Sequence, residues 1–249
     1  MLVRTPSQRK KVAPRAMPFP DGISYDPRLA KEHVSSKLKA GFNEALDELT
    51  RRGLLLVHDK TFPSLTGLTI DGPIRGSWWA HPLSNDVYMI SQQLQHCGDV
   101  AMTKLVSGKQ TYLHRRLWPH LLAIGLARDA WQLDGLAETA ASSMAKTERR
   151  GNVRLDEVGL VRSRKELSED ACALAMRLLV FADDIHTESG AHVRRLATWQ
   201  NWADRHDVPL SHLPAASDAR AEFERLVGVA NAECSASAFL PWQKKGRST

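Results

Sequence analysis

The densest group of titratable side chains in the sequence lies in the stretch FADDIHTESGAHVRR, residues 181–195. If this stretch continues as a helix, Asp184, Glu188 and His192 recur every four residues along one face. A carboxylate beside a histidine can serve as general acid and base, with the carboxylate orienting the imidazole. The same groups can activate water or stabilise the oxocarbenium-like centre of N-glycosidic cleavage. We therefore take Asp184, Glu188 and His186 as candidate catalytic residues.

Two other interpretations of this cluster remain open. The first is an ordinary exposed helix face with ion pairs four residues apart. The second is a metal site that uses Glu188 and His192, although the spacing differs from the HExxH motif and Gly190 can interrupt the helix. We assign no metal ligand and expect no cofactor, because the sequence lacks a P-loop, a dinucleotide-binding glycine motif and a nucleophile elbow.

Two adjacent tryptophans stand in RGSWWAHP, residues 75–82. Neighbouring side chains cannot both point inward along a strand, so one of Trp78 and Trp79 is expected in the core. The other can stack on an extruded base, with Arg75 as a further nucleic-acid contact. His81 precedes a proline, which favours extended backbone there, and it is the fourth catalytic candidate. The alternative is that both tryptophans only join parts of the fold.

Residues 101–118, AMTKLVSGKQTYLHRRLW, are typical of a β-hairpin with its turn at SGKQ. Such a basic hairpin can lie along a phosphate backbone as a wing. The candidate nucleic-acid contacts in it are Lys104, Lys109, His114, Arg115 and Arg116. We expect alanine at Arg115 or Arg116 to weaken DNA binding and to leave the fold intact. An ordinary solvated basic face is the alternative.

The elements around these motifs indicate a mainly α-helical chain with small β-hairpins. Periodicity and start signals predict helices over 27–52, 83–96, 119–132, 136–149 and 217–232. A further helix is expected to begin at Ser168, with an apolar stripe that reaches Ile185. Residues 54–57 are predicted as a strand, and 61–82 as short strands and tight turns. The order of helices and hairpin resembles a winged helix, and residues 136–158 can form a weaker second copy.

The predicted organisation has four segments. They are a basic flexible arm over 1–24, a winged-helix-like part over 25–160, a helical C-terminal part over 161–240 and a basic tail over 241–249. The formal net charge is +6 and the isoelectric point is about 9.4. Because basic residues crowd both ends, we expect a polyanionic partner, with double-stranded DNA first.

Compartment signals in the sequence are few. No apolar run approaches the ~18–20 residues that a membrane span needs, and the basic start has no apolar stretch typical of a secretory signal. The three cysteines are far apart and odd in number, which argues against a disulfide framework. We therefore expect a cytoplasmic protein without membrane attachment.

Three stretches, GSWWAHP, TKLVSGKQTYLHRRLWP and HTESGAHVRRLATWQNW, resemble a group of bacterial proteins with no assigned activity. This resemblance therefore implies no catalytic residues. The predicted order of elements is also similar to that of winged-helix DNA glycosylases, in architecture only.

The leading hypothesis is a DNA glycosylase that extrudes a modified base and hydrolyses its N-glycosidic bond, in repair or phage defence. The alternative is a non-enzymatic winged-helix DNA-binding protein, such as a transcriptional regulator. A third possibility is a basic structural or partner-binding protein that binds no nucleic acid. Salt-dependent DNA binding distinguishes the first two from the third. Base release that is lost in Glu188→Gln or Asp184→Asn distinguishes the first from the second.

Overall fold

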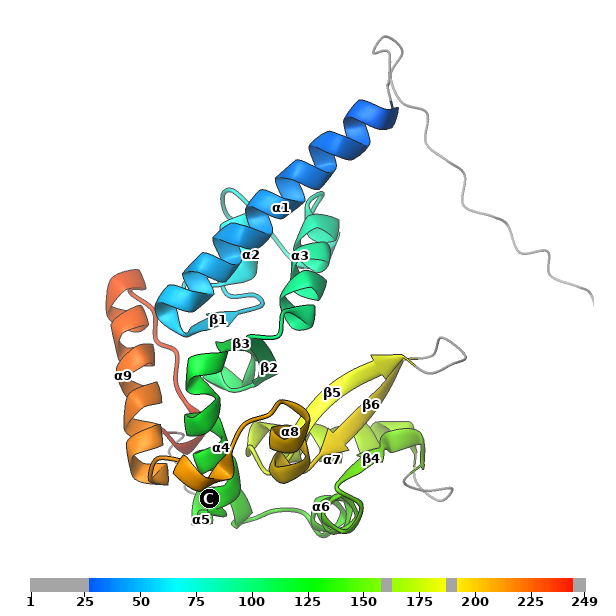
Figure 1. Cartoon of the computed structure of the whole chain (residues 1–249), viewed down its shortest axis with the longest axis vertical. Helices are drawn as coiled ribbons and strands as arrows, with labels where there is room; N and C mark the ends of the chain where they lie inside the picture. Colours follow the sequence, from blue (N-terminus) through cyan, green and yellow to red (C-terminus); the bar gives the residue numbers. More distant parts are fainter. Residues whose placement is uncertain (1–26, 158–162, 187–191, 244–249) are drawn as a thin grey trace, which may run out of the picture.

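The computed structural model describes residues 27–157, 163–186 and 192–243 (Figure 1). Within these ranges the chain combines helices with two small antiparallel sheets. The helices are α1 (Pro27–Arg52), α2 (Leu65–Thr69), α3 (Ser84–His96), α4 (Trp118–Ala127), α5 (Ala130–Leu133), α6 (Glu138–Arg150), α7 (Arg164–Met176), α8 (Trp199–Arg205) and α9 (Ala216–Cys234). The strands are β1 (Leu54–Leu56), β2 (Val100–Lys104), β3 (Gln110–His114), β4 (Asn152–Arg154), β5 (Phe181–His186) and β6 (His192–Ala197). Short 3-10 turns include η1 (Trp78–Ala80), η2 (Val106–Gly108), η3 (Arg115–Leu117) and η4 (Leu155–Glu157).

The first sheet has the strand order β1-β3-β2, and it is packed by α1, α2 and α3. Leu54 pairs with Leu113 and Met102 pairs with Tyr112, so the hairpin and the short apolar strand predicted from the sequence are confirmed. Helices α1 and α3 likewise confirm the predictions over 27–52 and 83–96. We call α1 through β3 the first unit.

The second sheet has the order β4-β6-β5 and packs against α6 and α7. Helix α6 confirms the prediction over 136–149, and β4 forms the small strand that follows it. In both sheets, therefore, the first strand in the chain pairs with the third, and the third pairs with the second. A helix precedes the first strand in each case, and another helix precedes the two strands of the hairpin. We call α6 through β6 the second unit.

The helix predicted from Ser168 to Ile185 is wrong at both ends. Helix α7 begins earlier, where Ser163 caps it through a reciprocal hydrogen-bond pair with Glu166. It ends at Met176, because Leu178 takes a positive φ of 52°. The following residues then form β5, so the C-terminal part expected to be helical contains a β-hairpin. Since β4 pairs with β6, the predicted division at 160/161 also lies inside one sheet.

Two other stretches differ from the prediction. Residues 61–82 were expected to form short strands, but they contain α2 and η1 and only an isolated bridge at Ser64. Ser64 accepts a hydrogen bond from the Gly67 N–H and so starts α2. The helix expected over 119–132 is divided, because Arg128 adopts a left-handed conformation that ends α4 before α5 begins.

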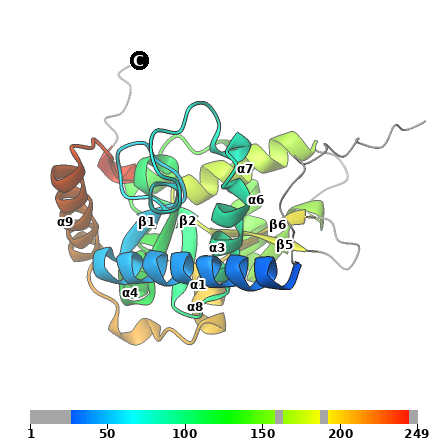
Figure 2. The ribbon, with the colours of Figure 1, turned by 90° about the horizontal axis from the view of Figure 1, so that it is seen from above.

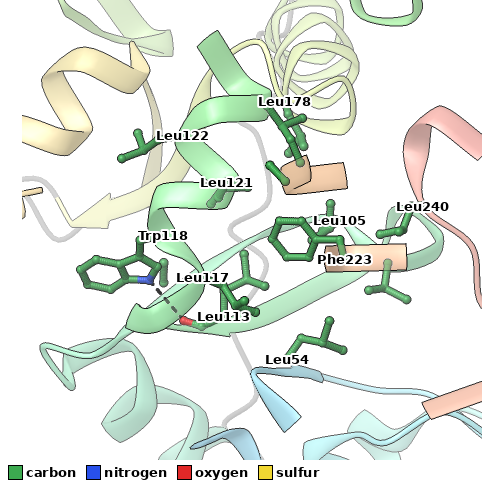
Figure 3. Close-up of a cluster of buried hydrophobic side chains, with 14 of the residues drawn as sticks. Leu54, Leu105, Leu113, Leu117, Trp118, Leu121, Leu122, Leu178, Phe223 and Leu240 are labelled. Carbon is green, nitrogen blue, oxygen red and sulfur yellow. Dashed lines mark hydrogen bonds between the residues drawn. The ribbon is translucent and has the colours of Figure 1, made fainter. Parts of the chain in front are cut away.

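Helices α4, α8 and α9 join the two units through a common apolar core. Leu121 of α4, Phe223 of α9 and Leu178 from the end of α7 meet in this core (Figure 3). Trp118 donates from Nε1 to the Leu113 carbonyl at 3.3 Å, which links α4 to β3. Seen from above, α9 and the β5–β6 hairpin lie at opposite sides of the molecule (Figure 2). Among the described helices, none has both the length and the hydropathy that a bilayer crossing requires.

Candidate nucleic-acid-binding groove

The two units meet along a groove of about 520 Å³. Its centre is formed by β2 and β5, which are edge strands of their sheets and lie against each other without sharing a sheet. One wall comes from η1 and α3 of the first unit, and the other from α7, β5 and β6 of the second. In Figure 1 the β5–β6 hairpin accordingly runs below α3. The groove lies within the size range of small-molecule sites in proteins.

The tryptophan pair borders this groove. Trp78 is 9% exposed and packs into the apolar core of the first unit, whereas Trp79 is 62% exposed. Their rings stack with centroids 3.9 Å apart and an interplanar angle of 26°. The prediction that one ring is in the core and the other is accessible is therefore confirmed. Arg75 is exposed in the loop before η1. The Trp79 ring stacks on the buried Trp78 ring, which holds it in a fixed orientation. Trp79 therefore offers a flat aromatic surface to the groove.

The acidic cluster lies on a hairpin, not on a helix. Asp183 and Asp184 are neighbours on β5, so their side chains point to opposite faces of the sheet. Each faces an arginine on β6. Asp184 Oδ1 accepts from Arg194 Nε at 3.1 Å, and Asp183 Oδ1 accepts from Arg195 Nε at 3.0 Å. Such cross-strand pairs of opposite charge stabilise the hairpin and explain why this stretch is a strand.

The described residues on both sides of 187–191 form strands, so they do not build the expected helical face of carboxylates and histidines. Glu188 lies outside the described residues, and His186 is described only as the β5 residue that pairs with His192. His81 accepts a hydrogen bond from the Leu83 N–H at 3.2 Å and is not among the residues that line the groove. Among the catalytic candidates whose side chains the structure describes, Asp184 lies on the groove wall, with a side chain that is 50% exposed, and His81 does not.

Two basic side chains of the β2–β3 hairpin are engaged in contacts with other segments of the protein. Lys109 Nζ lies 2.6 Å from Asp59 Oδ2. Burial raises the pKa of Asp59, but hydrogen bonds from Lys109 and two backbone N–H groups outweigh it and lower the pKa to about 2. Arg116 donates to the Thr50 and Arg51 carbonyls at 2.6 and 3.1 Å, so it caps the C-terminus of α1.

The end of the hairpin differs from the expected strand alternation. Strand β3 stops at His114, whose Nδ1 accepts from the Arg116 N–H at 3.3 Å and starts η3. Burial, followed by the Arg116 charge, lowers the pKa of His114. Arg115 is half exposed, with its guanidinium 3.7 Å from Asp99 and 5.3 Å from the Trp118 ring centroid. Arg115 therefore keeps a half-exposed charge at the end of the hairpin, at a longer distance from its carboxylate than Lys109.

The turn of this hairpin is covered by distant segments. The Ser107 N–H donates to the Phe239 carbonyl at 2.7 Å, and a side chain on Gly108 would come within 3.0 Å of Met176 on α7. A wing that follows a phosphate backbone needs an uncovered tip. The turn of the β2–β3 hairpin is therefore partly covered by contacts with other segments, whereas the β5–β6 hairpin extends away from the core (Figure 1).

Several groove residues were missed by sequence reasoning. Gln92, Gln95 and His96 place amide and imidazole groups on the α3 wall. Lys104 was expected on the wing surface, but its Nζ lies 3.2 Å from Cys172 Sγ of α7, inside the groove. Gln92, Gln95 and His96 lie three and one positions apart on a predicted helix, and this spacing could have indicated that they share a face. Nothing local to Lys104 indicated its contact, because Cys172 is 68 residues away.

Charge is distributed unevenly between the described and undescribed parts of the chain. The described residues contain equal numbers of basic and acidic side chains, so the positive excess belongs to the segments outside them, chiefly 1–26 and 244–249. No group of three or more potential metal ligands comes together among the described residues. Comparisons of the chain with protein-family models, with curated proteins and with solved structures find no match.

Proposed function

We propose that this protein binds double-stranded DNA through two winged-helix-like units. Both units repeat the order helix, strand, helix and two-stranded hairpin, with the first strand paired to the third. In the first unit α2 and α3 precede the hairpin, and in the second η4 and α7 take the same places. In winged-helix proteins the helix before the hairpin enters the major groove, and the hairpin contacts the backbone.

The observation that carries this proposal is that the accessible helix belongs to one unit and the accessible hairpin belongs to the other. The turn of the first unit's hairpin contacts Phe239 and Met176, which partly cover it, and α7 of the second unit packs against β2. What remains accessible is α3 from one unit and the β5–β6 hairpin from the other, on opposite walls of one groove. Helix and wing thus come from different units and form one composite surface.

The composite surface and the basic ends have different tasks in this proposal. The α3 wall carries amides such as Gln92 and Gln95, which can hydrogen-bond to base edges. Because the described residues are electrically balanced, the long-range attraction to phosphates comes from the basic termini. Changes in the basic termini should therefore alter the affinity for DNA, and changes on α3 should alter the contacts with bases.

Fluorescence anisotropy with labelled duplexes over a range of salt concentrations tests the proposal. We expect a steep fall of affinity with salt, because every neutralised phosphate contributes about −0.9 to the logarithmic slope. Trp79→Ala is expected to weaken binding, whereas Phe239→Ala, an exposed aromatic outside the groove, is the matched control. Affinity that does not depend on salt, or equal loss in both variants, contradicts the proposal.

A second candidate function is base excision by a DNA glycosylase, favoured because Trp79 and Asp184 line the same groove. The accessible ring can support an extruded base, and the carboxylate can activate water or stabilise positive charge at the sugar. Asp184 is paired with Arg194, so that ion pair must open or share the carboxylate.

Release of bases from duplexes with varied modifications tests this second candidate. Asp184→Asn should abolish release and retain binding, whereas Asp204→Asn on the exposed side of α8 should retain both release and binding. Binding without release from any duplex indicates the non-enzymatic alternative, a DNA-binding protein such as a regulator.

A further inference from the structure

The groove wall contains one lysine among the described residues, Lys104 at the end of edge strand β2. Its Nζ lies 3.2 Å from Cys172 Sγ, and no ion pair with a carboxylate is formed within the described residues. Lys109, only five positions later, is instead bound to Asp59 at 2.6 Å. Lys104 thus contacts a thiol, whereas Lys109 contacts a carboxylate.

The Lys104 amine lies beside a thiol on a groove wall that also carries apolar side chains. Small apolar side chains on α7, Ala171 and Ala175, line the groove on either side of Cys172. Thr103 also lines the groove, and its buried hydroxyl has no hydrogen-bond partner among the described residues. The amine and the thiol therefore stand as a close pair on a partly apolar wall, where a proton can pass between nitrogen and sulfur.

We propose that Lys104 is a nucleophile that forms an imine with an aldehyde bound in the groove, and that Cys172 exchanges its proton. The Cys172 thiolate takes a proton from the ammonium, and the neutral amine attacks the carbonyl carbon to give a carbinolamine. The thiol then protonates the departing hydroxyl group. Water leaves, the protonated imine forms, and the thiolate is restored, so one amine and one aldehyde give one imine and one water.

The aldehyde that fits this place is the ring-opened deoxyribose of an abasic site in duplex DNA. This assignment rests on the proposed DNA binding and on base release. The exposed ring of Trp79 can fill the gap that a missing base leaves in the stack. Lys104 lines the same groove as Trp79, so one bound nucleotide could contact both side chains.

Trapping with cyanoborohydride, which reduces an imine to a stable secondary amine, tests the inference on the full-length protein. The probe is a duplex with a single abasic site, and the control duplex carries a tetrahydrofuran analogue without an aldehyde. Covalent complexes are measured on denaturing gels, and binding of both duplexes is measured by anisotropy. We expect Lys104→Arg to reduce trapping at least about tenfold, because it keeps the charge and removes the nucleophile. Lys109→Arg should trap like the parent protein.

Three further readouts decide the outcome. Lys104→Gln repeats the test if the arginine variant melts at a lower temperature than the parent. Cys172→Ser should move the pH of half-maximal trapping upward, which a purely structural cysteine would not do. Free 2-deoxyribose 5-phosphate with cyanoborohydride, followed by peptide mapping, tests the amine without any duplex.

The failures are distinguishable. Undiminished trapping by Lys104→Arg and Lys104→Gln overturns the inference, as does tight binding of the abasic duplex without trapping by the parent. If no duplex binds but the small aldehyde labels Lys104, the imine chemistry stands and the DNA function is wrong. If neither occurs, both are wrong.

Discussion

Gly125 of α4 packs against the Trp199 indole of α8, and its replacement by alanine gives a sharp test of this packing. A Cβ atom there would lie 2.3, 2.5 and 2.6 Å from three atoms of the Trp199 indole, well below the 3.0 Å limit of real Cβ contacts. The indole cannot move freely, because it is 1% exposed and donates from Nε1 to the Leu178 carbonyl at 2.7 Å. Either α4 or the ring must shift.

The expected cost follows from these contacts. Overpacking costs roughly 1–3 kcal/mol, and loss of the indole hydrogen bond adds roughly 0.5–1.5 kcal/mol. Alanine stabilises a helix by roughly 0.5–1 kcal/mol relative to glycine, which offsets part of this cost. We expect Gly125→Ala to lower the free energy of unfolding by about 2 kcal/mol, and the melting temperature by about 4–8 °C for a chain of this size.

Urea titration followed by tryptophan fluorescence measures the change, with the slope against urea expected to stay constant. Gly228→Ala in α9 is the matched control, since nothing lies within 4 Å of its added Cβ. This control should be as stable as the parent or slightly more stable. If Gly125→Ala matches the control, the close contact of α4 with Trp199 is refuted.

Three further predictions concern charge. The contacts of Arg116 with the α1 carbonyls reverse the expectation from the sequence for this residue: Arg116→Ala should lower the free energy of unfolding by about 1–2 kcal/mol, because these carbonyls lose their cap, and should leave DNA affinity unchanged; urea titration and anisotropy measure both. Asp59→Asn should destabilise the protein by roughly 1–2 kcal/mol at pH 7, because the ordinary pKa of 3.8 falls to about 2 in the folded state. The difference should shrink as the pH falls from about 4 to about 2, where the parent carboxylate takes up its proton, and an unchanged difference at pH 2 contradicts the assignment. Deletion of residues 1–24 removes five cations, so the logarithmic salt slope of DNA binding should flatten by up to about 4, and an unaltered slope shows that the arm contacts no phosphates.

Local patterns were sufficient for most helices and for the first hairpin. The apolar periodicity over 83–96 and the turn at SGKQ depend on residues a few positions apart, and α3 and β2–β3 formed as they predicted. The tryptophan pair was likewise interpretable, since adjacent side chains must diverge. Propensity and periodicity are short-range properties, and they determine elements whose stabilising contacts are also short-range.

The stretch 181–195 shows where local patterns were insufficient. Its residues satisfied a helical spacing of acids and histidines, yet β5 pairs with β6 and its aspartates bind Arg194 and Arg195. The same residue types thus fit two periods, and the tertiary pairing selects one of them. The pairing also changes the expected chemistry. A carboxylate beside a histidine can orient the imidazole for acid–base catalysis, whereas Asp183 and Asp184 are bound to arginines.

The sequence by itself determined that the chain is a basic, mixed helical and hairpin protein whose positive excess lies at its ends. Only the tertiary structure decided which side chains share a site. Arg116 became a helix cap and Lys104 became a groove residue, although both stand in one basic hairpin. The physical reason is that the contacts of each side chain come from segments about 65 residues away, and no local pattern records which distant segment a strand edge will face.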